Sequence, residues 1–453
     1  MTNLFGHSIR SELLLLYVAE ALACFAAVYL LLAFGISGAS SGSGGAIATF
    51  AALLALCAGA ISGASGLYQP ETWSRADRLL LGTIVAGLLL TLLAWLAFSL
   101  LGPVPPQDPR GLLVGILLAF AMVVMSTRLG FAFAARNGLL RRRLAVVHNP
   151  AAGVRPAVPG TEGGEGRPGT FEVAFTVSAA DEALGEALAP ERLRAQRIWA
   201  VLVAEPATLP PEIRGRCEGA GLRVFSEAAF REQQLSRVDL ERLPEDWLAT
   251  ARSVRERRLE AMLRRSFDIA VSFALLTFTL PLLLATALAI RLDSRGPVFY
   301  RQERVGLNGR IFTLLKFRSM VVNAESDGTP CWASKHDPRV TRIGRFIRLT
   351  RIDEIPQVLN VLRGDMSIVG PRPERPAFVQ QLNCLIPHYA DRAVVKPGIT
   401  GWAQVNYPYG ASVEDARMKL AYDLYYVGRR SFFLDLLILI ATVRVVLFQE
   451  GAR

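Results

Sequence analysis

Four long apolar runs fill most of the first third of the sequence and set the strongest limit on the folds it can adopt. The runs are Leu13–Gly35, Ala46–Leu67, Leu79–Leu101 and Gly111–Ala135. Each is close to the roughly 20 residues that an α-helix needs to cross a bilayer, and 52% of the whole chain is hydrophobic. We therefore expect a four-helix transmembrane bundle over residues 1–138. The first run is not expected to be a signal peptide, because three more runs follow it.

Charges around these runs indicate how the bundle is oriented. Residues 36–45 carry no charge, whereas the 67–78 connection carries two arginines and Arg141–Arg143 follow the fourth run. Basic segments stay in the cytoplasm, which places both ends of the bundle there. Glu20 and Arg128 lie inside the runs, where charges are costly, so we expect them to face the bundle interior or to snorkel toward the membrane surface. A polar transport path is the alternative.

The overall charge and the cysteines narrow the class of protein further. A net charge of +11 suits an anionic partner, such as lipid headgroups, nucleotide phosphates or nucleic acid. The five cysteines are scattered and none forms a Cys-x-x-Cys pair, so neither a zinc site nor a disulfide framework is indicated.

Residues 139–238 alternate between strand-like and helix-like segments. The strand candidates are Leu144–Val147, Phe171–Val177, Ile198–Val203 and Leu222–Phe225, and the helix candidate is Pro211–Gly219. Such alternation is typical of a Rossmann-like α/β domain. No G-x-G-x-x-G fingerprint follows the first strand, so we expect a regulatory or dimerisation domain rather than a dinucleotide site. Residues 239–265 then form a basic linker that is expected to be helical.

A fifth apolar run, Ile269–Ile290, contains Pro281 near its middle. Proline removes one backbone hydrogen bond and kinks a helix. Arg264 and Arg265 precede the run and Arg291 follows it, which favours a cytoplasmic location for both ends. We therefore expect a re-entrant helix that enters one leaflet and turns back at Pro281. A kinked helix that crosses the membrane completely is the alternative.

Two adjacent acids, Asp353 and Glu354, lie at the predicted start of a short helix downstream of this run. Pro356 fits the first turn of that helix, where a missing N–H costs little. The helix dipole favours negative charge at this end. Two carboxylates, nearby arginines and a helix N-terminus suit phosphoryl transfer with a divalent metal ion. On their own these residues also fit a capped surface helix with solvated charges.

Longer motifs surround the acid pair. They read Lys-Phe-Arg-Ser-Met over residues 316–320, Gly-Pro-Arg-Pro-Glu over 370–374, Lys-Pro-Gly-Ile-Thr-Gly-Trp over 396–402 and Tyr-Asp-Leu-Tyr-Tyr-Val over 422–427. With these motifs in this order, residues from about 264 to 453 resemble the bacterial sugar transferases, which are monotopic polyprenyl-phosphate sugar-1-phosphate transferases. The bundle and middle domain resemble the large members that prime exopolysaccharide or O-antigen synthesis. Residues 406–415 resemble the branch associated with exosortase systems.

The resemblance implies a mostly helical cytoplasmic catalytic domain that, with the re-entrant helix, covers residues 266–453, and a two-step reaction. Asp353 would be the nucleophile that attacks the β-phosphate of a UDP-sugar, UDP-glucose or UDP-galactose, and releases UMP. Undecaprenyl phosphate would then take the sugar phosphate from the aspartate. Glu354 would assist as a base or through Mg²⁺, which Asp353 and Glu354 would hold.

Other polar residues in the same motifs are candidates for substrate binding. They are Lys316, Arg318, Arg351, Arg372, Gln404, Asp423 and Asp435. Lys316 and Arg318 alternate with Phe317, so both can project from one face of a strand. Tyr407–Gly410 departs from the family pattern, which leaves nucleotide and sugar preference open. Leu280 also departs from it, standing before Pro281 where the small enzymes have Ser.

These expectations describe an α+β, multi-pass protein of the bacterial inner membrane with its catalytic domain facing the cytoplasm. Inner-membrane lipids and a second copy in a homodimer are its expected partners, and nucleic acid is not. Phe432–Phe448 is expected to lie on the membrane as an interfacial helix, with a further span as the alternative. A polytopic transporter or flippase-associated protein with a nucleotide-sensing domain is the alternative function. It leaves the acid pair and the arginine motifs unexplained.

Overall fold

The structure, a computed structural model, describes most of the chain. The described residues are 2–4, 7–9, 11–35, 44–68, 76–101, 109–138, 141–148, 158, 171–204, 209–243, 246–251, 258–322, 337–408, 410 and 412–448. Among them, five helical segments are long and apolar enough to cross a membrane: Leu14–Ala33, Gly44–Ala64, Leu79–Ser99, Arg110–Phe131 and Arg258–Asp293. They coincide with the five runs that the sequence predicts. Contacts divide the chain into two compact units, residues 1–125 with 245–453 and residues 126–244.

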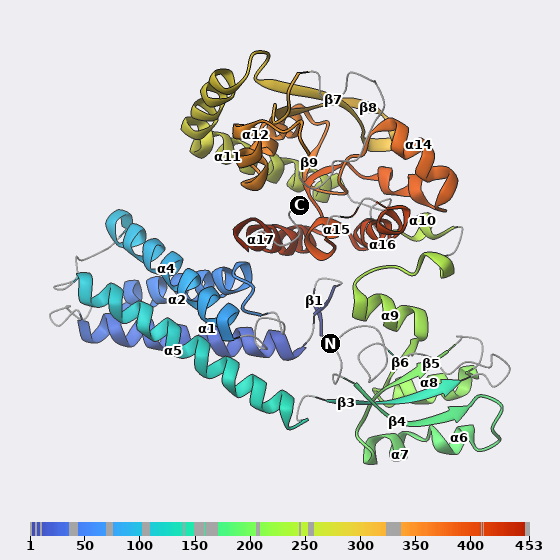
Figure 1. The fold of residues 1–453 in the computed structure, drawn as a ribbon. Helices are drawn as coiled ribbons and strands as arrows, with labels where there is room; N and C mark the ends of the chain where they lie inside the picture. The colour runs from blue at the N-terminus through green and yellow to red at the C-terminus, as the bar shows by residue number, and fades with distance from the viewer. Residues whose placement is uncertain are drawn as a thin grey trace. The chain divides into compact units, whose positions relative to one another are not determined.

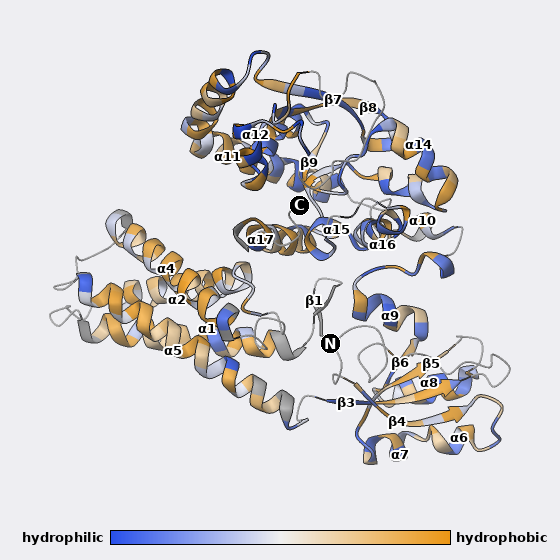
Figure 2. Ribbon diagram, viewed as in Figure 1, coloured by the Kyte–Doolittle hydropathy of each residue, from blue (hydrophilic) through white to orange (hydrophobic). Residues whose placement is uncertain are grey.

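The N-terminal bundle consists of α1 (Ser11–Gly35), α2 (Gly44–Ala64), α4 (Ala76–Leu101) and α5 (Pro109–Arg136), preceded by a short hairpin of β1 (Thr2–Leu4) and β2 (His7–Ile9) (Figure 1). All four helices contribute apolar side chains to one core, and Figure 2 shows their hydrophobic character along their length. As expected, Glu20 faces inward: it is 1% exposed and accepts a hydrogen bond from the Ser62 hydroxyl across 2.8 Å. Arg128 is also buried.

The middle domain is built on a parallel sheet. Its strands β3 (Arg142–His148), β4 (Phe171–Ser178), β5 (Ile198–Val203) and β6 (Arg223–Ser226) lie in the order β4-β3-β5-β6. All four overlap the predicted strands. The associated helices are α6 (Leu184–Ala187), α7 (Pro190–Ala195), α8 (Pro211–Gly219) and α9 (Glu227–Leu235). The segment after β3 that lacks the glycine fingerprint, residues 149–153, lies outside the described residues.

Alternate residues of these strands pack on opposite faces of the sheet, as strand geometry requires. On one face Val147 and Val201 pack with Leu193 of α7, and on the other Val146 and Leu202 pack with Phe230 of α9. Both faces are therefore covered, which explains why the strands read as continuous apolar runs rather than alternating ones.

The described part of the linker over residues 239–265 contains short helical segments. It contains η3 (Leu240–Arg242), a 3₁₀ turn, then α10 (Trp247–Thr250) and the first residues of α11 (Arg258–Asp293). Residues 244, 245 and 252–257 lie outside the described part of the chain.

Helix α11 includes Pro281, and both of its ends contact the catalytic domain. Near its start, Arg264 Nε lies 2.7 Å from Asp435 Oδ2; near its end, Ile290 is buried against Phe317 and Ile347. Between these ends the helix is more exposed, and Phe278 is 86% exposed. Figure 1 shows that α11 changes direction part-way along its length.

The rest of the catalytic domain is mostly helical, as predicted. Its strands are β7 (Phe299–Val305) paired with β8 (Ile311–Phe317), and β9 (Ser367–Val369) paired with β10 (Gly398–Thr400). Its helices and 3₁₀ turns are η4 (Leu307–Gly309), α12 (Arg342–Leu349), η5 (Ile352–Gln357), α13 (Val358–Arg363), α14 (Pro376–Leu385), η6 (Tyr389–Val394), α15 (Trp402–Asn406), α16 (Val413–Arg429) and α17 (Phe432–Phe448).

Candidate active site

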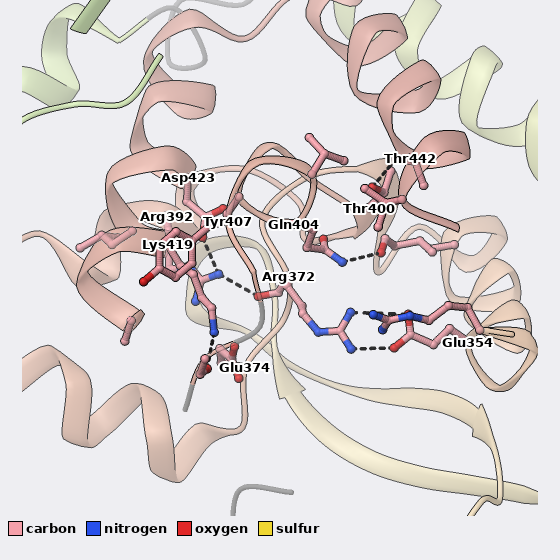
Figure 3. Close-up of a pocket in the computed structure, with 18 of the residues that line it drawn as sticks. Glu354, Arg372, Glu374, Arg392, Thr400, Gln404, Tyr407, Lys419, Asp423 and Thr442 are labelled. Atoms are coloured by element: carbon pink, nitrogen blue, oxygen red, sulfur yellow. Dashed lines mark hydrogen bonds and ion pairs between the residues drawn. The ribbon is translucent and has the colours of Figure 1, made fainter. Parts of the chain in front are cut away.

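A cavity of about 450 Å³ lies inside the catalytic domain. Charged side chains from η5, the 371–374 segment, η6 and α16 line it, as Figure 3 shows. Apolar side chains form the rest of the wall, among them Leu275 of the membrane helix α11 and Val445 and Val446 of α17. The cavity therefore combines a polar interior with a wall from two apolar helices.

The acid pair enters this site on a tight turn. Arg351, which lines the cavity, has φ 59°, the left-handed region that a non-glycine residue rarely occupies. The chain then forms the 3₁₀ turn η5 before α13 begins at Val358. Asp353 and Glu354 are thus the second and third residues of a 3₁₀ turn, whereas the sequence predicts the N-cap of a helix. Pro356, which the sequence places in the first turn of a helix, instead lies inside η5, two residues before α13 begins.

Glu354 faces the cavity and is held by two cations. The Lys316 ammonium on β8 donates to Glu354 Oε1 across 2.9 Å, and Arg372 Nη2 donates to the same oxygen across 2.6 Å. Burial raises the pKa of Glu354, but the charges of Arg372 and Lys316 outweigh burial and hold this pKa well below its usual range. Glu354 therefore stays ionised at all pH values near neutrality.

Asp353 has a different environment. It is 8% exposed and is not among the residues that line the cavity. Burial, reinforced by the charge of Glu354, raises the pKa of Asp353 to about 6, although Lys316, Arg348 and Arg372 oppose the shift. The two neighbouring acids thus have opposite pKa shifts, which is the pattern expected where two carboxylates take different chemical roles.

A second charged group lies further along the cavity. Arg392 Nη2 of η6 lies 2.7 Å from Asp423 Oδ2 of α16, and Arg392 Nη1 donates to the Tyr389 hydroxyl across 2.9 Å. Burial raises the pKa of Asp423 to about 6 despite the Arg392 charge. The Lys419 ammonium donates to the Gly410 carbonyl across 2.6 Å. Of these residues only Asp423 was a candidate from sequence; Arg392, Tyr389 and Lys419 belong to no recognisable short motif.

The remaining candidates divide into two groups. Arg351, Arg372 and Gln404 line the cavity, and Gln404 Nε2 donates to the Ile399 carbonyl across 3.1 Å. Arg318 and Asp435 do not line it. Arg318 Nη2 instead donates to the Ser294 carbonyl across 2.8 Å and so holds the segment after α11 to the domain. Asp435 pairs with Arg264 and so holds α11 itself to the domain.

Mg²⁺ prefers oxygen ligands and is usually held by one or two carboxylates together with substrate phosphates. Among the described residues, no group of three or more His, Cys, Asp or Glu residues is arranged to hold a metal ion. Asp353 fits as a single carboxylate ligand. Glu354 fits less well, because Lys316 and Arg372 already share its oxygen.

Comparison with known proteins gives the family. A profile of the family described as "Bacterial sugar transferase" matches residues 259–449. A Bacillus subtilis protein described as "Uncharacterized sugar transferase EpsL" is 45% identical over 192 residues, which are 42% of this chain and 91% of that protein. The chain belongs to the bacterial sugar transferase family.

Two larger relatives carry names that state a reaction. The Aeromonas hydrophila protein "UDP-N-acetylgalactosamine-undecaprenyl-phosphate N-acetylgalactosaminephosphotransferase" is 43% identical over 238 residues, 52% of this chain and 55% of that one. The Escherichia coli K12 protein "UDP-glucose:undecaprenyl-phosphate glucose-1-phosphate transferase" is 44% identical over 184 residues, 40% of this chain and 39% of that one. The matches thus span about half or less of these larger relatives.

The sugar transferase segment contains the whole site. Every residue that lines the cavity, from Leu275 to Val446, lies within the matched residues 259–449. The N-terminal bundle and the middle domain lie outside this segment. In the Bacillus relative the matching region is nearly the complete protein, so this segment is the part that bacterial sugar transferases of different sizes share.

Proposed function

We propose that this bacterial sugar transferase moves a sugar-1-phosphate from a UDP-sugar to undecaprenyl phosphate. The observation that carries the proposal is the acid pair: Glu354 is held by Lys316 and Arg372 next to an Asp353 whose pKa is raised, inside the segment that defines the family. The apolar wall from α11 and α17 suits a polyprenyl chain, and the arginines suit a diphosphate.

The first step forms a covalent intermediate. The Asp353 carboxylate attacks the β-phosphorus of the UDP-sugar, a new O–P bond forms, and the bond to the bridging oxygen breaks. UMP leaves with that oxygen, and the sugar phosphate stays on Asp353 as an acyl phosphate. A carboxylate nucleophile replaces one difficult transfer by two easier ones. Asp353 directly precedes Glu354, which lines the cavity, so the attacking carboxylate lies next to the space that would hold the substrate.

The second step regenerates the enzyme. A phosphate oxygen of undecaprenyl phosphate attacks the same phosphorus, the bond to Asp353 breaks, and undecaprenyl-diphospho-sugar leaves. Arginine presents five N–H donors, so Arg372, which lines the cavity, can bind phosphate oxygens while it holds Glu354, and Lys316 holds Glu354 from outside the cavity lining. Mg²⁺ bound by Asp353 and the phosphates, with Glu354 nearby, would neutralise negative charge in the transition state.

We also propose the membrane arrangement that this reaction needs. Contacts of both ends of α11 with one catalytic domain support a re-entrant helix that turns at Pro281, because a helix that crossed the bilayer would separate its ends. The active site then faces the cytoplasm at the inner membrane. The parallel sheet with both faces covered supports a Rossmann-like middle domain, and we propose that it regulates or dimerises the enzyme.

The sugar that this protein transfers can be identified by testing a panel of UDP-sugars. The named relatives use UDP-glucose or UDP-N-acetylgalactosamine, while the family resemblance alone suggested UDP-glucose or UDP-galactose. Purified full-length protein in lipid nanodiscs should release UMP from at least one UDP-hexose when undecaprenyl phosphate and Mg²⁺ are present. Absence of UMP release across the panel, with folded protein, would exclude the proposed function.

A further inference from the structure

The backbone of the Gly-Pro-Arg-Pro-Glu segment is held by its carbonyls. The Pro371 carbonyl accepts from the Gly398 N–H across 3.0 Å, the Arg372 carbonyl from Arg392 Nη2 across 2.9 Å, and the Pro373 carbonyl from Arg304 Nη1 across 2.9 Å. Prolines have no N–H to donate, so carbonyls are the main groups through which this stretch can be fixed. Two of the three donors are arginine side chains distant in sequence.

Arg392 is itself fixed from several sides. Asp423 Oδ2 lies 2.7 Å from Arg392 Nη2, and Asp423 is 2% exposed on α16. The Tyr389 hydroxyl accepts from Arg392 Nη1, and the guanidinium carbon lies 5.3 Å from the Tyr389 ring centre. A planar guanidinium can serve these partners and a carbonyl at once, which the compact ammonium of lysine cannot.

Resting on the proposed function, we propose that Arg392, anchored by Asp423, is a positioning residue that sets the place of Arg372 and thereby of Glu354. The contacts form a chain from Asp423 to the Arg392 guanidinium, to the Arg372 carbonyl, and through the Arg372 side chain to Glu354 Oε1 at 2.6 Å (Figure 3). α16 and η6 thus control the geometry of the acid pair without belonging to its motif.

This series of contacts explains why the buried acid Asp423 and the partly buried Arg392 lie at the cavity yet apart from the acid pair. If Arg392 moves, the Arg372 carbonyl loses its hydrogen bond from Arg392 Nη2, and the Arg372 side chain is no longer held in one direction. Small displacements of a catalytic group lower rates strongly, on the order of 100-fold for about 1 Å. Positioning therefore predicts a loss in kcat, with little change in the KM for the UDP-sugar.

A double-mutant cycle tests this route. The single variants are Arg392→Met and Arg372→Met, and the readout is kcat for UMP release by the full chain in nanodiscs with undecaprenyl phosphate. We expect Arg392→Met to lose about 10- to 100-fold, and the double variant to be no slower than Arg372→Met alone, because both remove the same function. If the two losses in kcat multiply in the double variant, Arg392 acts independently of Arg372 and the proposal is overturned. A wild-type kcat in Arg392→Met would also overturn it.

Two further variants serve as controls. Arg392→Met alone leaves the buried Asp423 carboxylate without its cation, which can destabilise the protein. Combining Arg392→Met with Asp423→Asn removes both charges and avoids this cost, so that the protein stays folded. Arg339→Met breaks the ion pair with Asp337, 2.6 Å long and outside the cavity lining, and should keep wild-type kcat.

A structure of the Arg392→Met protein by cryo-electron microscopy gives a readout that needs no turnover. We expect Arg372 to leave Glu354, whereas Arg372 retained within hydrogen-bonding distance of Glu354 would overturn the proposal. If wild-type protein released no UMP, the proposed function would fail, but this structural measurement would still decide the role of Arg392.

Discussion

The middle domain and the catalytic domain bury different kinds of side chain. Among described residues 141–243 the buried charged residue is Glu227, whose neighbours Arg231 and Arg242 lie 3.6 and 3.4 Å away. The described part of residues 258–448 buries seven charged residues: Arg264, Asp268, Arg318, Asp337, Asp353, Asp423 and Asp435. The sheet of the middle domain is stabilised by apolar burial, which needs no partners.

Charged side chains are buried only where a partner or a chemical role offsets the cost, because desolvation of an ion is unfavourable unless the ion is paired. Within the catalytic domain two reasons separate. Arg264 and Asp435 pair away from the cavity and join α11 to α17. Burial raises the pKa of Asp268 as well, but Asp268 does not line the cavity and accepts hydrogen bonds from Ser367 and Ile368. Asp353 and Asp423 also have raised pKa values, and they lie at or beside the cavity. The catalytic domain therefore contains more buried charged residues than the middle domain. Those at or beside the cavity belong to the active site, and those away from it stabilise the fold.

The largest expected effect is on the acid that we assign as nucleophile. Asp353→Asn keeps the shape of the side chain but removes the attacking oxygen charge, so UMP release should fall by at least about 1,000-fold. Asp337→Asn is the matched control, since Asp337 is equally buried but pairs with Arg339 outside the cavity lining. Initial rates and thermal unfolding should be measured for both. More than a few per cent residual activity in Asp353→Asn would refute the assignment.

A smaller effect should follow pH. Burial and Glu354 raise the pKa of Asp353 to about 6, and only the ionised form attacks phosphorus. UMP release should therefore fall about tenfold per unit as the pH drops below 6. The apparent pKa belongs to the acid pair, but Glu354, whose pKa is low, stays ionised over this range.

Stability should respond to pH in the opposite direction. A raised pKa means that the folded state favours protonated Asp353 more than the unfolded state does. The contribution of Asp353 to the free energy of unfolding is therefore full below about pH 4 and is lost as the pH rises through 6. Asp423, with its pKa also raised to about 6, acts in the same sense. Measuring kcat and the unfolding temperature from pH 5 to 8 separates the two trends. A rate that is constant from pH 5 to 7 would contradict the raised pKa of Asp353.

For the buried ion pair of Arg264 and Asp435 we expect a moderate effect on stability rather than on rate. Asp435→Asn leaves the buried Arg264 charge without its carboxylate, which should lower the free energy of unfolding by about 3–5 kcal/mol. Glu227→Gln in the middle domain breaks only contacts of 3.4 and 3.6 Å to partly exposed arginines and should cost about 1 kcal/mol or less. Chemical denaturation measures both, and equal losses would remove the distinction between the two domains.

The smallest effect on rate is expected from the apolar core of the middle domain. Leu202→Ala on β5 removes a fully buried side chain and should destabilise that domain by about 2–5 kcal/mol. UMP release should stay within about twofold of wild type at temperatures where both domains remain folded. A large loss under those conditions would show that the sheet is coupled to the active site.

The sequence predicted most elements because their signals are local. Apolar runs of membrane length located the five long helices, and apolar strands between turn residues located the sheet. Lys316, Glu354 and Arg372 were candidates through their motifs, and the structure brings these three side chains together.

The rest depends on tertiary contacts that no local pattern encodes. Arg392 meets Asp423 and the Arg372 carbonyl only because η6 packs against α16 and the 371–373 segment. Arg318 shares a motif with Lys316 but turns toward Ser294, since the segment after α11 offers it two carbonyls. The left-handed Arg351 and the 3₁₀ turn after it also follow from the surrounding packing, and they place Asp353 beside the cavity rather than in its wall.

In the proposed reaction Asp353 carries the sugar phosphate between donor and acceptor. The direct measurement is to mix the full chain with its UDP-sugar and Mg²⁺ without undecaprenyl phosphate, quench in acid, and map the adduct by peptide mass spectrometry. We expect up to one UMP per site and a hexose-phosphate mass on the peptide that contains Asp353, and no such mass in Asp353→Asn. UMP that appears only when acceptor is present, with no adduct, or an adduct on Glu354, would contradict it.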